Sequence, residues 1–428
     1  MTREIIGNER TGENYVRIKH DSGLEILIWK MPGFSLKHAI FGTRYGSVNT
    51  TFKTEDDTDF VTVPEGIAHY LEHKLFENED TDVFDLYAQT GAFGNAYTTF
   101  DKTCYLFSCT DNFIPSLKIL LKFVQEPYFT EETVAKEQGI IGQEIKMYDD
   151  TPDWRVFFGL LECIYHRNPV RINTAGTVES IAQITPELLY RCYYSFYDLH
   201  NMTLAIAGDV DEEEILKACD ELLVRKDDKK LISVVPEEPE EVAKHYAEES
   251  LEIAVPMFSY GFKSKPVADE ELSAESALGE ITLSLLADET SPLYKELYDS
   301  GLINSQLYTE MFSGNGFFVP IISGESRSPK TVRELVDKEI ERRKTVGFEK
   351  ERFENIKKAY YGNLIKTLGN AEGLATLMIN AGLGHTGSAF ASIDAVAKIS
   401  MDDVMRFLSE RLDTANSSLF VINPKEAV

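Results

Sequence analysis

The sequence predicts an α+β fold of two duplicated domains, each an antiparallel-rich β-sheet packed against helices. The first observation is length, since 428 residues exceed what one domain commonly holds. The second is a repeat of strand-like and helix-like patterns on either side of a charged segment that contains two prolines. The third is a match between the closing strands, which read Asn-Met-Thr-Leu at 201–204 and Asn-Ser-Ser-Leu at 416–419.

The first domain is expected to span residues 1–225. Short runs rich in β-branched and aromatic residues, bounded by turn residues, predict its strands, and periodic apolar spacing predicts its helices. The expected strands lie at 24–29, 39–45, 95–99, 103–109 and 202–208. The expected helices lie at 66–76, 82–89 and 212–223, and helical periodicity dominates from 112 to about 197.

A charged linker is expected at 226–250, and a second, homologous domain at 251–428. The pattern of the first domain recurs in the second. Its expected strands lie at 251–255, 257–263, 305–311, 317–323 and 417–422, and its first two expected helices at 272–286 and 292–300.

The composition is that of a soluble globular protein, with 43% hydrophobic and 27% charged residues. The formal net charge of −28 argues against binding to nucleic acid or to anionic membranes, because both attract basic surfaces. An acidic surface could attract basic peptides, although solubility alone also explains such a charge.

Cysteine usage and hydropathy predict the compartment. The five cysteines, at 104, 109, 163, 192 and 219, are scattered and do not suggest a disulfide framework. The N-terminal stretch has no apolar core of signal-peptide length, and no run approaches 18 apolar residues. We therefore expect a cytoplasmic protein.

Residues 69–73 read His-Tyr-Leu-Glu-His and hold two of the chain's eight histidines. On a helix, His69 and His73 would share one face and could bind one metal ion through their imidazole nitrogens. Glu72 would project from nearly the same side. A carboxylate there suits a general base, because zinc lowers the pKa of a bound water toward about 7. The alternative is two solvent-facing histidines on an amphipathic helix.

A metal site of this kind needs a third ligand, since catalytic zinc usually has three protein ligands and one open position. The strongly helical run at 131–148 offers Glu137 and Glu144, which are two turns apart and share one face. Three isoleucines in the same run indicate that part of this helix is buried, and a buried glutamate normally needs a partner. Taken alone, two surface glutamates remain the simpler interpretation.

Together these stretches resemble a known family. HYLEH at 69–73, GAFGNAYTTFDKTCYLF at 91–107 and EQGIIGQEIKMYDD at 137–150 are similar to the inverted-zincin metallopeptidases, whose signature is HxxEH. That family includes pitrilysin, insulin-degrading enzyme and the mitochondrial processing peptidase. The resemblance covers most of the chain and is nearest to the zinc-bearing subunit of bacterial two-gene zinc-protease pairs. It implies one zinc ion per chain and a fold that forms half of a clamshell.

The resemblance also implies a role for each residue of the site. His69, His73 and Glu144 would bind zinc. Glu72 would be the general base and would later pass its proton to the leaving amine, while Glu137 would orient a ligand. The chain would then be a zinc metalloendopeptidase or oligopeptidase that hydrolyses extended peptides inside a chamber. The alternative is a noncatalytic peptide-binding or scaffold subunit of the same fold.

The family likeness further implies an exposed edge strand that binds substrate as an added strand. Its residues would be Ala92, Phe93, Gly94, Asn95, Ala96 and Tyr97. Asn95 and Ala96 would lie closest to the scissile bond. Small residues would keep the edge open, and main-chain hydrogen bonds tolerate many substrate sequences. The alternative is an ordinary hairpin edge.

The second half departs from the active relatives. Aligning Gly91 with Gly301 carries the histidine pair onto Gly-Glu-Ile-Thr-Leu at 279–283, so the second half lacks the metal-binding histidines. Tyr298 and Asn304 fall where active relatives carry an Arg and a Tyr that hold the substrate and polarise its carbonyl. A phenol cannot replace a guanidinium as a fixed cation. We therefore expect a paralogous partner subunit that lacks HxxEH and supplies this Arg/Tyr pair, with a homodimer as the second possibility.

Overall fold

The computed structural model describes residues 1–79, 82–225, 228, 230–304, 307–384 and 386–425. The chain forms two compact units, each containing a β-sheet and helices, which confirms the α+β class. The first unit comprises Met1–Ile145, Asn173–Val235 and Ile365–Phe390, and the second comprises Lys146–Ile172, Pro236–Leu364 and Ala391–Val428.

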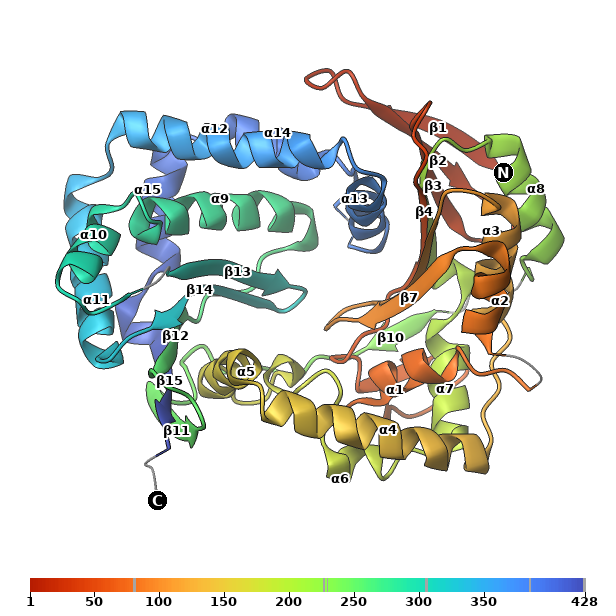
Figure 1. Cartoon of the computed structure of the whole chain (residues 1–428), viewed down its shortest axis with the longest axis horizontal. Coiled ribbons are helices and arrows are strands. Elements are labelled where there is room, and N and C mark those ends of the chain that lie inside the picture. The colour runs from red at the N-terminus through yellow and green to blue at the C-terminus, as the bar shows by residue number, and fades with distance from the viewer. Residues whose placement is uncertain (80–81, 226–227, 229, 305–306, 385, 426–428) are drawn as a thin grey trace. The chain divides into compact units, whose positions relative to one another are not determined.

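The first unit is built on a mixed sheet with the strand order β1-β2-β3-β9-β4-β8-β7 (Figure 1). Its neighbouring strands run antiparallel, except that β3 and β9 are parallel. The strands are β1 Thr2–Gly7, β2 Asn14–Lys19, β3 Glu25–Lys30, β4 Lys37–Thr43, β7 Phe93–Thr98, β8 Thr103–Cys109 and β9 Met202–Gly208. Sequence patterns predict β3, β4, β7, β8 and β9. They miss β2 and also β1, whose residues are almost all exposed and therefore carry little apolar signal.

Helices cover both faces of this sheet. Figure 1 shows α13 on one face and α2, α3 and α8 on the other. Because it is covered on both sides, β9 is buried along its whole length, which explains its continuous apolar run. The helices of this unit include α1 Ile67–Lys74, α2 Val83–Thr90, α3 Phe113–Phe123, α7 Pro186–Phe196, α8 Glu212–Leu222 and α13 Ala371–Leu383.

The second unit repeats this topology. Its sheet has the order β11-β15-β12-β14-β13, with β11 and β15 parallel and the other pairs antiparallel. The run β3-β9-β4-β8-β7 of the first unit has the same path, with its parallel pair in the same place. This correspondence supports an internal duplication. The strands are β11 Tyr246–Leu251, β12 Met257–Phe262, β13 Tyr308–Gly314, β14 Phe317–Glu325 and β15 Ser417–Pro424.

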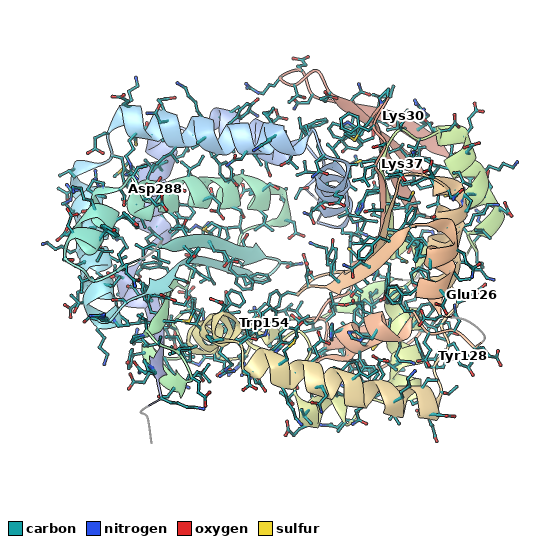
Figure 2. All side chains as sticks on the ribbon, in the orientation of Figure 1. Lys30, Lys37, Glu126, Tyr128, Trp154 and Asp288 are labelled. Carbon is teal, nitrogen blue, oxygen red and sulfur yellow. The ribbon has the colours of Figure 1, made fainter. Side chains whose placement is uncertain are left out.

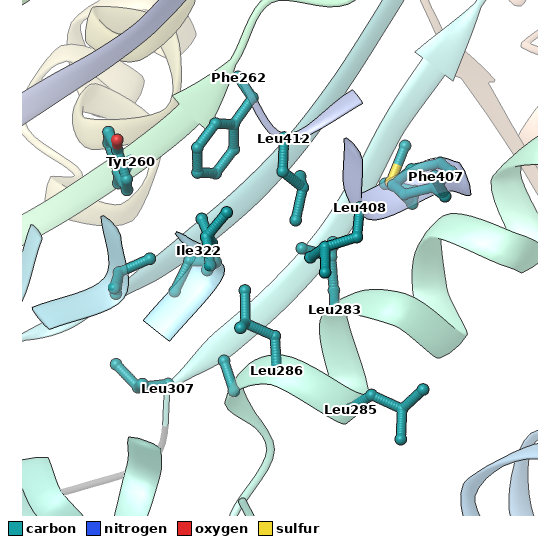
Figure 3. Close-up of a cluster of buried hydrophobic side chains, with 14 of the residues drawn as sticks. Tyr260, Phe262, Leu283, Leu285, Leu286, Leu307, Ile322, Phe407, Leu408 and Leu412 are labelled. Carbon is teal, nitrogen blue, oxygen red and sulfur yellow. The ribbon is translucent and has the colours of Figure 1, made fainter. Parts of the chain in front are cut away.

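Helices α9 and α15 and the sheet enclose the core of the second unit, part of which Figure 3 shows. The helices of this unit include α5 Pro152–Ile164, α9 Asp269–Ala287, α10 Pro292–Asp299, α11 Pro329–Val346, α12 Lys350–Thr367, α14 Ala391–Lys398 and α15 Met401–Arg411. The buried side chains labelled in the figure include Tyr260, Phe262, Leu283, Leu286, Ile322, Phe407, Leu408 and Leu412. Their removal from water is the main stabilising term of this unit.

Two helices pack in a different unit from the one that their positions along the chain predict. Helix α5 precedes the expected boundary at 225, yet it packs on β12 and β15 of the second unit. A Cβ at Gly159 of α5 would lie 2.3 Å from the ring of Phe420, so this helix approaches β15 closely. Trp154 of the same helix, labelled in Figure 2, stacks on Tyr148. In return, α13 packs on β3, β4 and β9 of the first unit.

The expected linker at 226–250 contains regular structure. Strand β10, Leu231–Ser233, pairs with β5, Thr51–Thr54, in a small sheet completed by β6, Val61–Thr62. Strand β11 begins within the same segment and replaces the strand expected at 251–255. Both are edge strands whose residues are half-buried or exposed; β11 is mostly polar, like a linker, and β10 has only three residues, too few for a periodic signal. Residues 226, 227 and 229, and 305 and 306 of another expected strand, lie outside the described residues.

All five cysteines have free thiols, and all five are buried, which their scattered positions do not predict. Within the described ranges, no helix combines the length and the apolar character needed to cross a membrane.

Candidate metal centre and active site

Helix α1 carries the two histidines of the HxxEH stretch. It begins after Gly66, whose φ of 85° lies in the left-handed region. A Cβ at Gly66 would lie 2.3 Å from the carbonyl oxygen of Ala175, so only glycine fits here. His69 and His73 lie on the partly exposed face of the helix. The apolar residues that anchor the opposite face are Ile67, Ala68, Tyr70 and Leu71.

Helix α4, Glu131–Asp149, brings two glutamates to the same place. Its buried residues Val134, Ile141 and Ile145 confirm that part of this helix is buried. The hydroxyl of Tyr70 on α1 donates to the backbone carbonyl of Val134 and joins the two helices. Because Glu137 and Glu144 are two turns apart, both side chains reach the histidines of α1.

The three predicted metal ligands converge. Nε2 of His69 lies 3.2 Å from Oε2 of Glu144, and Nε2 of His73 lies 3.5 Å from the same oxygen. One ligand atom from each residue lies within 4.8 Å of the other two. Tetrahedral zinc with bonds of about 2.0–2.1 Å would place neighbouring ligand atoms about 3.4 Å apart. The donor set therefore fits a single zinc ion.

The environment of His69 favours positive charge. Burial opposes protonation of the imidazole, but hydrogen bonds and charge attraction from Glu144 and Glu72 outweigh burial and raise the pKa of His69 to about 9. A metal ion bound by this imidazole would take the place of the proton, so binding would release protons.

Glu137 lies behind His73 rather than among the ligand atoms. Its Oε1 is 3.0 Å from Nδ1 of His73, so the carboxylate can accept a hydrogen bond from the Nδ1–H group. The other nitrogen, Nε2, then carries no proton and can bind a metal ion shared with Glu144, whose Oε2 is 3.5 Å away. This placement agrees with the orienting role that the resemblance implies.

Glu72 is 7% exposed and lies beside the ligands. Its Oε2 accepts a hydrogen bond of 2.6 Å from the hydroxyl of Thr98 and lies 3.5 Å from Nδ1 of His69. Sequence reasoning missed Thr98, which follows the stretch at 92–97 directly. Side-chain alternation places Thr98 on the same strand face as Ala96, but no signal in the sequence joins it to Glu72.

Strand β7 is the edge strand that the resemblance implies, since it ends the strand order and pairs only with β8 in the part of the chain that the structure describes. Asn95 is exposed, and Phe93 is 71% exposed. Packing also requires a glycine at position 94, because a Cβ there would lie 2.5 Å from the ring of Tyr87. Ala92 precedes the strand, and its backbone N–H donates to the carbonyl of Tyr87.

A cleft of about 630 Å³ opens beside these groups. Phe76 and Phe84 form an apolar wall, with ring centroids 4.6 Å apart and planes 9° from parallel. Nothing in the sequence pattern singles out Phe84 for this position. The other residues of the lining include Glu72, His73, Asn95, Ala96, Lys136, Glu137 and Ile140.

Tyr298 and Asn304 lie in the second unit. Tyr298 lies in the last turn of α10 and is 54% exposed, and its ring stacks on that of Tyr294 with the centroids 6.0 Å apart. Asn304 is exposed and follows the same helix. Both residues are accessible to solvent. That they cannot hold a substrate and polarise its carbonyl, as the Arg and Tyr of active relatives do, stays a prediction.

Two histidines and a downstream glutamate on facing helices, with a second glutamate inside the HxxEH turn, define the inverted-zincin class of metallopeptidases. The chain belongs to peptidase family M16. The insulinase (peptidase family M16) model matches residues 62–178, and the peptidase M16 inactive-domain model matches residues 183–360. A Bacillus subtilis protein described as an uncharacterized zinc protease, YmfH, is 36% identical over 423 residues, which cover 97% of this chain and 98% of that protein.

Solved structures agree with this assignment. An M16-like peptidase from Alicyclobacillus acidocaldarius has a TM-score of 0.92 and 32% identity, with 99% of each chain covered. A protease from Helicobacter pylori has a TM-score of 0.82 at 17% identity, covering 96% of this chain and 99% of that one. Pitrilysin matches 99% of this chain with 47% of its own, at a TM-score of 0.75 and 16% identity. The last two likenesses concern the fold alone.

Proposed function

We propose that this chain is a zinc-dependent endopeptidase or oligopeptidase that hydrolyses extended peptides inside a chamber formed with a second subunit. The observation that carries the proposal is the convergence of His69 and His73 on one oxygen of Glu144, with Glu72 beside them. A noncatalytic scaffold would have no need of this donor set. The zinc-protease names of the relatives also support the proposal.

Zinc, when bound, would act as a Lewis acid that polarises the substrate carbonyl and lowers the pKa of water to about 7. Glu72 would accept a proton from the attacking water as the water oxygen bonds to the carbonyl carbon. The protonated Glu72 would then donate that proton to the leaving nitrogen as the C–N bond breaks, and the products are a carboxylate and an amine. Glu137 would hold His73 in the tautomer whose Nε2 is free to bind.

Strand β7 would bind the substrate main chain, with Asn95 and Ala96 next to the scissile bond, because both line the cleft beside Glu72. An added strand must be extended, so peptides should be cleaved in preference to folded proteins. Digestion of a tightly folded protein at the rate of a short peptide would contradict this mode. A cytoplasmic location is part of the proposal and rests on the scattered cysteines and the hydropathy of the sequence.

The test combines metal analysis with peptide cleavage. Purified protein should bind one zinc ion per chain, and a mixed library of unstructured peptides should be cleaved with the metal and not after its removal by a chelator. Cleavage should return when zinc is added back. Absence of both bound zinc and cleavage would favour the noncatalytic scaffold, and full cleavage without zinc would contradict the zinc-dependent mechanism.

A further inference from the structure

The β7–β8 hairpin places a pair of threonines against the predicted base, of which Thr98 is half-buried and Thr103 is buried. Thr98 and Thr103 are direct partners across the two strands, so their side chains lie on the same face of the sheet. Their hydroxyl oxygens are 3.3 Å apart. The hydroxyl of Thr103 donates to the carbonyl of Tyr45 at 2.8 Å, and the Thr103 residue is fully buried.

The direction of these hydrogen bonds follows from the count of protons. A hydroxyl has one proton to donate and two lone pairs. A carboxylate can only accept, so the 2.6 Å bond to Oε2 of Glu72 takes the proton of Thr98, while the proton of Thr103 goes to the carbonyl of Tyr45. A short bond from a hydroxyl to a carboxylate in a buried setting is stronger than one between neutral groups.

This bond restrains the part of Glu72 that the helix does not. The backbone of α1 fixes where the side chain starts, but the terminal torsion of a glutamate is broad, so the carboxylate plane turns easily without a partner. Among the described residues, the recorded contacts of this carboxylate, with Thr98 and His69, are both made by Oε2. Neither of these two contacts involves Oε1.

We propose that Thr98 is a positioning residue for hydrolysis, whose hydroxyl holds the Glu72 carboxylate so that Oε1 receives the water proton. The inference rests on the proposed peptidase function. Ala96, two residues earlier on the same face of β7, lines the cleft with Glu72. One strand would therefore set the position of the base and that of the substrate main chain, which makes their separation insensitive to movement of the hairpin.

The test uses Thr98→Val, which keeps the shape of the side chain and removes the hydroxyl, and Thr98→Ser, which keeps the hydroxyl. Thr98→Val should lower kcat by about 10–100-fold, because a misplaced base loses part of a contribution of about 10²–10⁴. KM and zinc content should stay within about twofold of the wild type, and Thr98→Ser should recover most of kcat. Thr99→Val is the matched control, since the hydroxyl of Thr99 bonds Asp101 in the hairpin turn and not Glu72.

Crystal structures of the zinc-free wild type and Thr98→Val supply a readout apart from activity. The Glu72 carboxylate should turn away from its wild-type plane in the valine variant. An unchanged kcat, or a serine variant as impaired as the valine variant, would overturn the inference, as would an unchanged carboxylate plane. If the wild type cleaves no peptide, the proposed function fails, and the crystal comparison alone decides whether Thr98 holds Glu72.

Discussion

The Glu137 carboxylate lies 3.0 Å from Nδ1 of His73, although the two residues are 64 positions apart. We expect Glu137→Ala to weaken zinc binding by about 10–100-fold, since outer partners of metal-binding histidines contribute on that scale. Competition with a chelator of known affinity measures the effect. Glu132→Ala, on the exposed part of the same helix, is the control and should bind zinc like the wild type. Equal affinity of Glu137→Ala and the control would exclude the orienting role.

A Glu72→Gln variant should lose hydrolysis but keep its bound zinc. A neutral amide of similar shape cannot accept the water proton, so hydrolysis should fall by at least about 10²-fold. The zinc content should stay at one ion per chain, because His69, His73 and Glu144 are unchanged. Metal content and peptide cleavage should be measured on the same sample. Turnover near that of the wild type would remove Glu72 from the mechanism.

Two glycine substitutions should shift stability in opposite directions. Gly94→Ala should lower the free energy of unfolding by about 1–3 kcal/mol, because the new Cβ would lie 2.5 Å from the buried ring of Tyr87. Gly139→Ala, in the middle of α4 with no atom within 4 Å of the new Cβ, should raise it by about 0.5–1 kcal/mol. Urea unfolding of the metal-free variants measures both. If Gly94→Ala raised the free energy of unfolding instead, the ring of Tyr87 would have to move aside without loss of stability, which contradicts this prediction.

Stability should depend on pH through His38. Burial lowers the pKa of His38 to about 4, only partly opposed by the charge of Glu372. Its imidazole accepts from or donates to the hydroxyl of Ser108 at 2.7 Å. Since the unfolded chain binds this proton near pH 6.5, the stability contributed by His38 is present above that pH and is lost as the pH falls toward 4.

The measurement compares the wild type with His38→Asn, both metal-free, at pH 7.5 and 5.5. The wild type should lose about 1.4 kcal/mol more than the variant over this interval, because its lower end lies one pH unit below the unfolded pKa of about 6.5. Between pH 7.5 and 8.5 the two proteins should change in parallel, because His38 is neutral in both states there. Parallel behaviour at the lower pH as well would mean that His38 is not held neutral.

Activity should require a second, different chain. Tyr298 and Asn304 occupy the positions at which an Arg and a Tyr are expected, and a missing preorganised donor to the developing oxyanion lowers the rate by about 10²–10³-fold. Adding a paralogue that lacks HxxEH and carries the Arg/Tyr pair should therefore raise peptide hydrolysis by about that factor. The same paralogue with its Arg changed to Ala is the control. Full turnover by this chain alone, unchanged by the partner, would point to a homodimer.

Residue spacing alone is enough to predict the local parts of the site. The spacing of His69 and His73 in a periodic apolar run predicts a helix with both rings on one face, and α1 has that form. The run at 131–148 likewise predicts α4 and the shared face of Glu137 and Glu144. Local periodicity carries this information because a helix or strand repeats its geometry every few residues.

Which distant groups come into contact depends on how the helices and strands pack in three dimensions. No spacing rule joins Thr98 to Glu72 or assigns the ring of Tyr87 to Gly94, because both contacts arise when β7 packs against α1 and α2. The same holds for α5 and α13, which pack in the units that their positions along the chain do not predict. An amphipathic helix encodes that one face must be buried, but the sheet that buries it is chosen by shape and by the chain's path in space.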